Sequence, residues 1–181
     1  MKLIPGILIF IISIISFSCK KEIAELPPAT QTGANTFGCK MDGQLWLPSG
    51  FGFASTASIL EANYFDGRTI IINARNFSSS PTESEFEIHL MNVVTPGVYL
   101  LNANTAKYPN QTGNYAYYVA RKVIPTNEWM TNSQYTGQVE ITKTDTINRI
   151  VSGTFQFQAL NLYNTPQPIN VTEGRFDIKI Q

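Results

Sequence analysis

From Phe37 to the end of the chain, apolar and polar residues alternate with a period of two, and this alternation constrains the fold more than any other feature. In residues 84–91, the apolar positions Phe86, Ile88 and Leu90 alternate with the polar positions Glu85, Glu87 and His89. No long stretch repeats its apolar residues at the spacing of 3.6 that marks an amphipathic helix. The alternation predicts strands with one face in the core and one face in water, as in antiparallel sheets.

Two Asp-Gly dipeptides predict tight hairpins, at Asp42-Gly43 and at Asp66-Gly67. Both central residues of a type I′ turn need a positive φ angle, and Asp-Gly is one of the few pairs that accept it. The first turn should join strands over 37–41 and 44–48, and the second should join strands over 58–65 and 68–76.

Five further segments continue the strand pattern: 84–91, 98–101, 115–122, 135–143 and 150–159. In the closing segment, 174–180, Phe176, Ile178 and Ile180 should face the core, while Arg175, Asp177 and Lys179 should face solvent. About ten short strands with frequent turns predict an all-β fold, an antiparallel β-sandwich, with a small lipocalin-like barrel as the alternative.

The 181 residues carry 13 basic and 13 acidic side chains, so the formal net charge is zero. A neutral chain offers no basic surface for phosphates, and we therefore expect no nucleic-acid partner. One His and two Cys are too few for a structural zinc site, and no cofactor is expected. Residues 36–181 fit a single domain.

The first 18 residues have the features of a signal peptide: Lys2, then an apolar run from Leu3 to Phe17, then Ser18 before Cys19. The small residue before Cys19 resembles a bacterial lipobox, although Ser16 stands where Leu is usual. We therefore expect cleavage before Cys19 and lipidation of its thiol. The alternative is an uncleaved anchor, but the apolar run is shorter than the roughly 20 residues that span a bilayer.

Residues 19–35 should comprise the lipidated Cys19 and a flexible tether, because Pro27-Pro28 and small polar residues show no apolar periodicity. The membrane is then a partner through the N-terminal lipid. We expect an outer-membrane location, on either the periplasmic or the surface-exposed side. Cys39 should be a small buried core residue rather than a reactive thiol.

Three blocks carry a resemblance to a known family: FGCKMDGQLWLPSG at 37–50, ITKTDTINRIVSGTFQFQALN at 141–161 and VTEGRFDIKI at 171–180. Together they resemble a Bacteroidetes lipoprotein family of unknown function. The resemblance implies a lipid-anchored, all-β protein of the cell envelope. It implies no activity, and so no catalytic residue is carried over.

The sequence offers little catalytic chemistry, and we expect no enzyme. His89 is the only His, and no G-x-S-x-G nucleophile elbow is present. His89 shares its predicted strand face with Glu85 and Glu87, and these three could hold a metal or orient a base. A hydrolase or metal enzyme around His89 is therefore kept as an alternative, although such a face is more often simply solvated.

A binding or structural accessory role is the main expectation, with a glycan or an envelope protein as the partner. Two polar segments carry aromatic residues, and the candidate ligand-binding residues are Trp129, Tyr108, Asn110 and Tyr117. Flat rings beside amides suit sugars, but the same residues could merely cover an open end of the sandwich. Asp145-Thr146-Ile147 resembles an O-glycosylation site, which makes Thr146 a candidate for modification.

Overall fold

A computed structural model describes residues 25–50, 58–78, 83–120, 127–163 and 167–181. The predicted signal peptide (1–18) and the lipidation site Cys19 lie outside these ranges. Within the described ranges the ordered elements are all strands, and no residue is helical.

The eleven strands are β1 (Thr36–Met41), β2 (Gln44–Trp46), β3 (Leu60–Phe65), β4 (Thr69–Asn76), β5 (Ser84–Leu90), β6 (Gly97–Leu101), β7 (Tyr115–Ala120), β8 (Glu128–Met130), β9 (Gly137–Asp145), β10 (Ile150–Asn161) and β11 (Ile169–Lys179). Every strand pair is antiparallel. The predicted all-β antiparallel architecture is confirmed.

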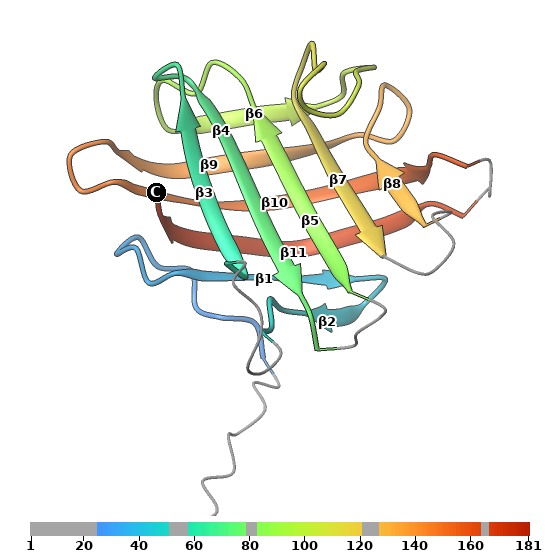
Figure 1. Ribbon diagram of the computed structural model, residues 1–181, viewed down its shortest axis with the longest axis horizontal. Helices are drawn as coiled ribbons and strands as arrows, with labels where there is room; N and C mark the ends of the chain where they lie inside the picture. The colour runs from blue at the N-terminus through green and yellow to red at the C-terminus, as the bar shows by residue number, and fades with distance from the viewer. Residues whose placement is uncertain (1–24, 51–57, 79–82, 121–126, 164–166) are drawn as a thin grey trace, which may run out of the picture.

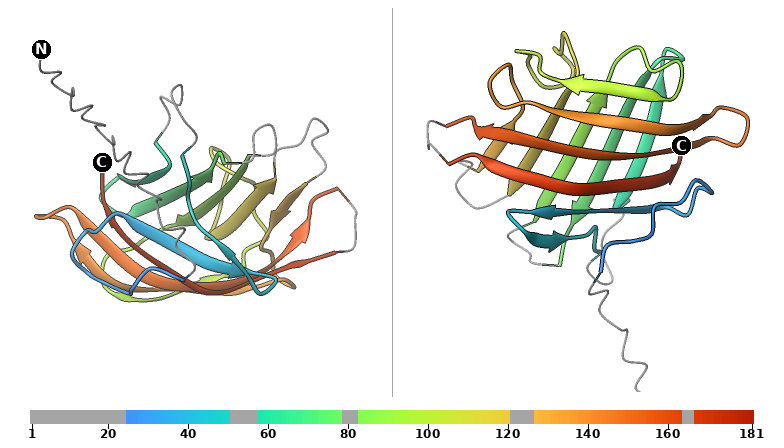
Figure 2. Two further views of the ribbon diagram at one scale, coloured as in Figure 1. Left: turned by 90° about the horizontal axis from the view of Figure 1, so that it is seen from below. Right: turned by 180° about the vertical axis from the view of Figure 1, so that it is seen from behind.

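The strands form two layers whose directions cross, as Figure 1 shows. One layer contains β3, β4, β5, β7 and β8, and the other contains β2, β1, β11, β10, β9 and β6. The layers are continuous, because Leu160 and Asn161 at the end of β10 pair with Met130 and Trp129 of β8. The sheet thus curls around its core, and the fold combines features of a sandwich and of a half-open barrel (Figure 2).

The core lies between the layers and is rich in aromatic side chains. Trp46 packs edge-on against Phe86, with ring centroids 4.6 Å apart, and against Phe37 at 5.8 Å. The Trp46 indole N–H donates to Ser84 Oγ at 3.0 Å, so its one polar atom is satisfied. Cys39 is fully buried, and burial raises the pKa of its thiol to about 12, which fits the predicted core role.

Both predicted hairpins are confirmed by their backbone geometry. Asp42 and Gly43 have φ angles of 49° and 81° between β1 and β2, and Asp66 and Gly67 have φ angles of 51° and 63° between β3 and β4. These four positive angles match the type I′ requirement that the sequence suggested.

The sequence predicts a last strand that starts at Gly174, but β11 starts at Ile169. The TEGRFD block, residues 172–177, therefore lies inside the strand. Glu173 and Gly174 lie in the middle of β11, where the register with its neighbours shifts. Glu173 has a φ of 53°, as expected of an inserted bulge residue. A Cβ atom on Gly174 would lie only 2.4 Å from the Phe155 ring, so this close approach requires glycine.

Candidate functional site

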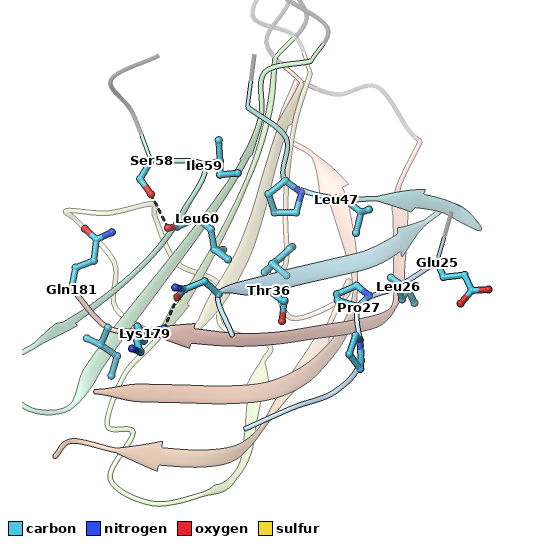
Figure 3. A pocket seen from close by; sticks show the side chains of 15 residues that line it. Glu25, Leu26, Pro27, Thr36, Leu47, Ser58, Ile59, Leu60, Lys179 and Gln181 are labelled. Atoms are coloured by element: carbon cyan, nitrogen blue, oxygen red, sulfur yellow. Dashed lines mark hydrogen bonds between the residues drawn. The ribbon is translucent and has the colours of Figure 1, made fainter. Parts of the chain in front are cut away.

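A largely apolar groove of about 890 Å³ opens where the two layers fail to close, between β3 on one side and β1 and β11 on the other (Figure 3). Its apolar lining consists of Leu26, Pro27, Pro28, Phe37, Leu47, Pro48, Ile59, Leu60 and Ile180. The polar lining residues are Glu25, Asn35, Thr36, Ser58, Lys179 and Gln181. We call this the β1–β3–β11 groove.

The gap is bridged by backbone contacts between the layers. The Gln181 N–H donates to the Ala62 carbonyl of β3 at 2.9 Å. The chain leaving β2 also crosses to the end of β4, where Ser49 N–H donates to the Arg75 carbonyl at 3.1 Å and Asn76 Nδ2 donates to the Leu47 carbonyl at 2.8 Å. No strand pairing joins β3 to β1 within the described ranges, and the groove lies in the opening between these two strands.

Residues 25–28 and Asn35 line one side of the groove, and the contacts of residues 25–35 with the domain differ from the flexible tether that the sequence predicted. Leu26 and Pro27 pack over Gly38, where a Cβ atom would come within 2.8 Å of Pro27 Cδ and of Leu47 Cδ2. Arg175 Nη1 donates to the Pro27 carbonyl at 3.4 Å. Because these contacts are specific, this part of the segment belongs to the folded domain.

Asp177 of β11 fixes the same segment and is itself 1% exposed, which corrects the expectation that it faces solvent. Its carboxylate accepts hydrogen bonds from Thr30 Oγ1, from the amides of Thr32, Gly33 and Ala34, from Thr32 Oγ1 and from Ser152 Oγ. Burial alone would raise the pKa of Asp177, but these donors outweigh it and hold the pKa well below its usual range. We call residues 30–34 with Asp177 the Asp177 clasp.

His89 is also buried, with 0% exposure, which corrects the expectation of a solvated strand face. Its ring stacks on Tyr115, with centroids 5.1 Å apart and an interplanar angle of 1°. Among the described residues neither ring nitrogen has a hydrogen-bond partner, and burial lowers the pKa of His89. A buried imidazole without an open side cannot reach a substrate in this structure.

Glu87 lies beside this pair, because the Tyr115 hydroxyl donates to its carboxylate and the Tyr108 amide donates to the same hydroxyl at 2.8 Å. Burial raises the pKa of Glu87 despite the bond from Tyr115. No group of three or more His, Cys, Asp or Glu side chains gathers at metal-binding distance within the described ranges. The predicted trio of His89, Glu85 and Glu87 therefore offers no assembled metal site.

Glu128 of β8 forms a second polar cluster with Lys107, Tyr117 and Tyr163. Lys107 Nζ lies 2.5 Å from Glu128 Oε2, and the hydroxyls of Tyr117 and Tyr163 donate to the same carboxylate at 2.6 Å and 3.0 Å. Burial raises the pKa of Glu128, but these three donors outweigh it and leave the pKa lowered. The carboxylate of this cluster, on Glu128, and its cation, on Lys107, are thus paired with each other.

The structure does not bring the four predicted ligand residues together. Trp129 is inside β8, where its ring packs on Tyr118 at 5.7 Å and its indole N–H donates to the Gln167 carbonyl at 3.0 Å. Lys107 Nζ lies 4.4 Å from the centroid of the Tyr117 ring and occupies one face of it. Tyr108 and Asn110 are exposed in the segment before β7, so no shared aromatic platform exists.

Thr146 lies in the turn between β9 and β10 and is exposed, next to Ile147 at 91% exposure. Asp145 Oδ1 accepts from the Asn148 amide at 2.8 Å, which shapes the turn. The candidate glycosylation site is therefore accessible.

The sequence did not predict the groove, because its lining comes from five separate segments of the chain: 25–28, 35–37, 47–48, 58–60 and 179–181. Leu26 and Pro27 stood in the predicted tether, and Ile59, Leu60 and Ile180 belonged to predicted strands with no sign that the strands leave a gap. A signal was available in Ile23 and Leu26, two large apolar residues in a segment that otherwise consists of charged, small, polar and proline residues.

A family model described as Domain of unknown function (DUF6252) matches residues 36–178. The chain belongs to this family. The match begins at the first residue of β1 and ends one residue before the end of β11, so the DUF6252 domain spans the whole strand system. The expected resemblance to an uncharacterised family is confirmed at that level.

No curated protein and no solved structure matches this DUF6252 chain. Residues 25–35 precede the family match, although they complete the groove and the Asp177 clasp. The part of the chain that the structure describes contains no helix with the length and apolarity needed to cross a bilayer.

Proposed function

We propose that this protein is a lipid-anchored component of the cell envelope that binds an apolar ligand in the β1–β3–β11 groove and catalyses no reaction. The observation that carries the proposal is the groove itself, with about 890 Å³ of space and walls of Leu, Ile, Pro and Phe side chains. Ligand pockets are commonly 300–1,000 Å³ in volume, mostly apolar, with a few polar groups.

The anchoring part of the proposal is supported by the N-terminal sequence. A basic residue, an apolar run and a small residue precede Cys19, as in lipoproteins of the Bacteroidetes type. Lipid on Cys19 would hold the protein at the outer membrane, on its periplasmic or its surface-exposed side.

A non-catalytic role is supported by the state of the groups that could act as a nucleophile or a base. The Cys39 thiol is fully buried with a raised pKa, and the His89 imidazole is fully buried with a lowered pKa. Catalytic groups must reach the substrate, and neither of these does so in the folded chain.

Ligand binding is tested with the full-length protein held in an amphipol and titrated with radiolabelled palmitate. Saturable binding is expected for the native chain. Ile59→Asp places a negative charge in the groove and should weaken binding at least about tenfold, because a charge is costly in an apolar site and this one repels the palmitate carboxylate. Val98→Asp is the matched control, because Val98 is an exposed aliphatic residue on β6 outside the groove. Equal binding by all three proteins would rule out the groove as the site.

Anchoring is tested by incorporation of radiolabelled palmitate in cells of the native host. Cys19→Ala should abolish labelling and release the protein from the membrane fraction. Cys39→Ala is the matched control and should keep both label and membrane retention. Labelled Cys19→Ala protein would contradict the anchor.

Glycan binding is a second candidate, favoured by a hollow of about 370 Å³ beside the segment that precedes β7. Its lining includes the amides of Asn104, Asn110 and Asn132 and the hydroxyls of Thr105 and Thr112. A glycan array tests this role: Asn110→Ala should lose any signal that the native chain gives, and Gln158→Ala on the other layer should keep it. An empty array for the native chain removes this candidate.

A further inference from the structure

We infer that the β1–β3–β11 groove holds an acyl chain of a lipid from the same membrane in which the Cys19 lipid is inserted. The inference rests on the proposed function and adds the chemical class and the source of the ligand. Three observations lead to it: the position of the groove relative to Cys19, the fixed path of the N-terminal segment, and the chemistry of the walls.

The groove lies close to the anchoring residue along the chain. Glu25, Leu26 and Pro27 belong to its lining, and Glu25 is only six positions after Cys19. An extended chain spans at most about 3.6 Å per residue, so roughly 20 Å separates Glu25 from Cys19 at full stretch. With Cys19 at the bilayer surface, the groove wall cannot leave that surface by more than this distance.

The N-terminal segment also places the groove on the side of the domain from which the anchor is reached. A free coil of residues 20–35 would let the domain turn in any direction, but residues 30–34 are held by Asp177 and Pro27 is held by Arg175. These contacts hold the chain beside the groove from Glu25 onward. Because Glu25 lies at the groove and is six positions after Cys19, the groove end of the domain is the end held near the membrane.

The walls match a flexible hydrocarbon chain. Leu26, Leu47, Ile59, Leu60 and Ile180 supply branched aliphatic surface from four parts of the chain, as Figure 3 shows for the first four of them. Among the described lining residues Phe37 alone is aromatic, so most of the described wall surface is aliphatic.

The charged lining residues do not favour a headgroup of one sign. Glu25 and Lys179 carry opposite charges and are the only ionisable side chains among the described lining residues. The groove therefore binds the hydrocarbon chain of its ligand rather than the headgroup. The membrane is the nearest source of such chains for an anchored protein.

The test uses the full-length lipoprotein reconstituted into phosphatidylethanolamine vesicles that contain a small fraction of phosphatidylethanolamine with a diazirine in mid-chain. After irradiation and proteolysis, mass spectrometry locates the cross-linked residues. Cross-links are expected on the groove peptides, around Leu26 and around Ile59–Leu60. Ile59→Arg should reduce their yield at least tenfold, and Val98→Arg should leave it unchanged.

The outcomes separate this inference from the proposed function. Cross-links confined to residues 19–24, or equal yields in Ile59→Arg and native protein, overturn the inference. If the native chain still binds palmitate in a groove-dependent way, the proposed function stands and only the membrane source is wrong. If palmitate binding is also absent, both fall.

Discussion

Asp177 and His89 occupy comparable positions in the two layers, and both were predicted to face solvent. Each stands at a polar position of a strand in which polar and apolar residues alternate, Asp177 in β11 and His89 in β5. Both are buried, at 1% and 0% exposure. The alternation correctly separates the two faces of each strand, but it does not indicate which outer faces are covered by other parts of the chain.

The two burials differ in how polar atoms are satisfied. Asp177 meets a segment rich in donors, and both of its oxygens accept hydrogen bonds from residues 30–34 and from Ser152. His89 meets the flat ring of Tyr115 and gains packing, but no partner for either nitrogen. The first site stabilises the charged state of its residue, and the second stabilises only the neutral state.

The largest expected effect comes from Asp177→Asn. The amide replaces one acceptor oxygen with a donor, and either orientation sets that donor against N–H or O–H groups of the clasp. Hydrogen bonds to charged groups contribute about 1.5–3 kcal/mol each, so we expect the free energy of unfolding to fall by about 3 kcal/mol in urea titrations. Amide hydrogen exchange at Thr32, Gly33 and Ala34 should lose protection.

The matched control for this variant is Asp66→Asn. Asp66 is exposed in the β3–β4 turn with a φ of 51°, a conformation that Asn also accepts. Its stability should change by less than about 0.5 kcal/mol. A similarly small change in Asp177→Asn would show that the clasp does not hold the segment.

A smaller loss is expected for Gly33→Ala, which disturbs the clasp without touching the carboxylate. Gly33 has a φ of 74°, and a Cβ atom there would lie 2.9 Å from Lys179 Cγ. The left-handed backbone costs a residue with a Cβ about 1–2 kcal/mol, and we expect a loss of that size in the same titration. Gly67→Ala, at a φ of 63° with open space around it, is the control that isolates the backbone cost from the contact with Lys179.

The sequence predicted the features that depend on local chemistry. Both Asp-Gly turns, the inward faces of β5 and β11, and the burial of Cys39 follow from φ preferences and from strand periodicity. These properties need only the residue and its near neighbours in the chain.

The sequence could not predict the features that depend on distant segments. Asp177 is covered by residues more than 140 positions earlier, and the groove joins Leu26, Ile59 and Ile180. The positions of Trp129 and Tyr117 have the same origin, since the Trp129 ring packs on Tyr118 and Lys107 lies over the Tyr117 ring. Such contacts depend on which strands pair and where the pairing stops. The alternation of apolar and polar residues within each strand does not show this.

Because the pKa values of both His89 and Asp177 are lowered, the free energy of unfolding should fall in two separate pH ranges. A group whose pKa is lower in the folded protein than in the unfolded chain stabilises the fold fully at pH values above its unfolded pKa. This stabilisation is lost as the pH falls. For His89 this loss begins below about pH 6.5, and for Asp177 it begins below about pH 3.9, where Glu128 adds to it. Glu87 acts in the opposite sense, because its pKa is raised and its contribution is lost as the pH rises.

Thermal unfolding between pH 8 and pH 3 measures these windows. His89→Phe should remove the part of the decline that begins near pH 6.5, and Asp177→Asn should remove part of the decline below about pH 4. Identical pH profiles for native protein and His89→Phe would show that the imidazole is protonated as readily in the folded chain as in the unfolded one.

The smallest effect, with the opposite sign, is expected for His89→Phe at pH 8. Phe keeps the ring that stacks on Tyr115 and removes two buried nitrogens that have no partner. Replacing an unsatisfied polar group with an apolar group of similar shape is nearly neutral or stabilising, so the free energy of unfolding should rise by up to about 1 kcal/mol. His89→Ala, which removes the ring as well, should instead lose about 2 kcal/mol or more because it leaves a cavity. If His89→Phe were as destabilising as His89→Ala, the nitrogens would have partners in solution, and the contrast between His89 and Asp177 would disappear.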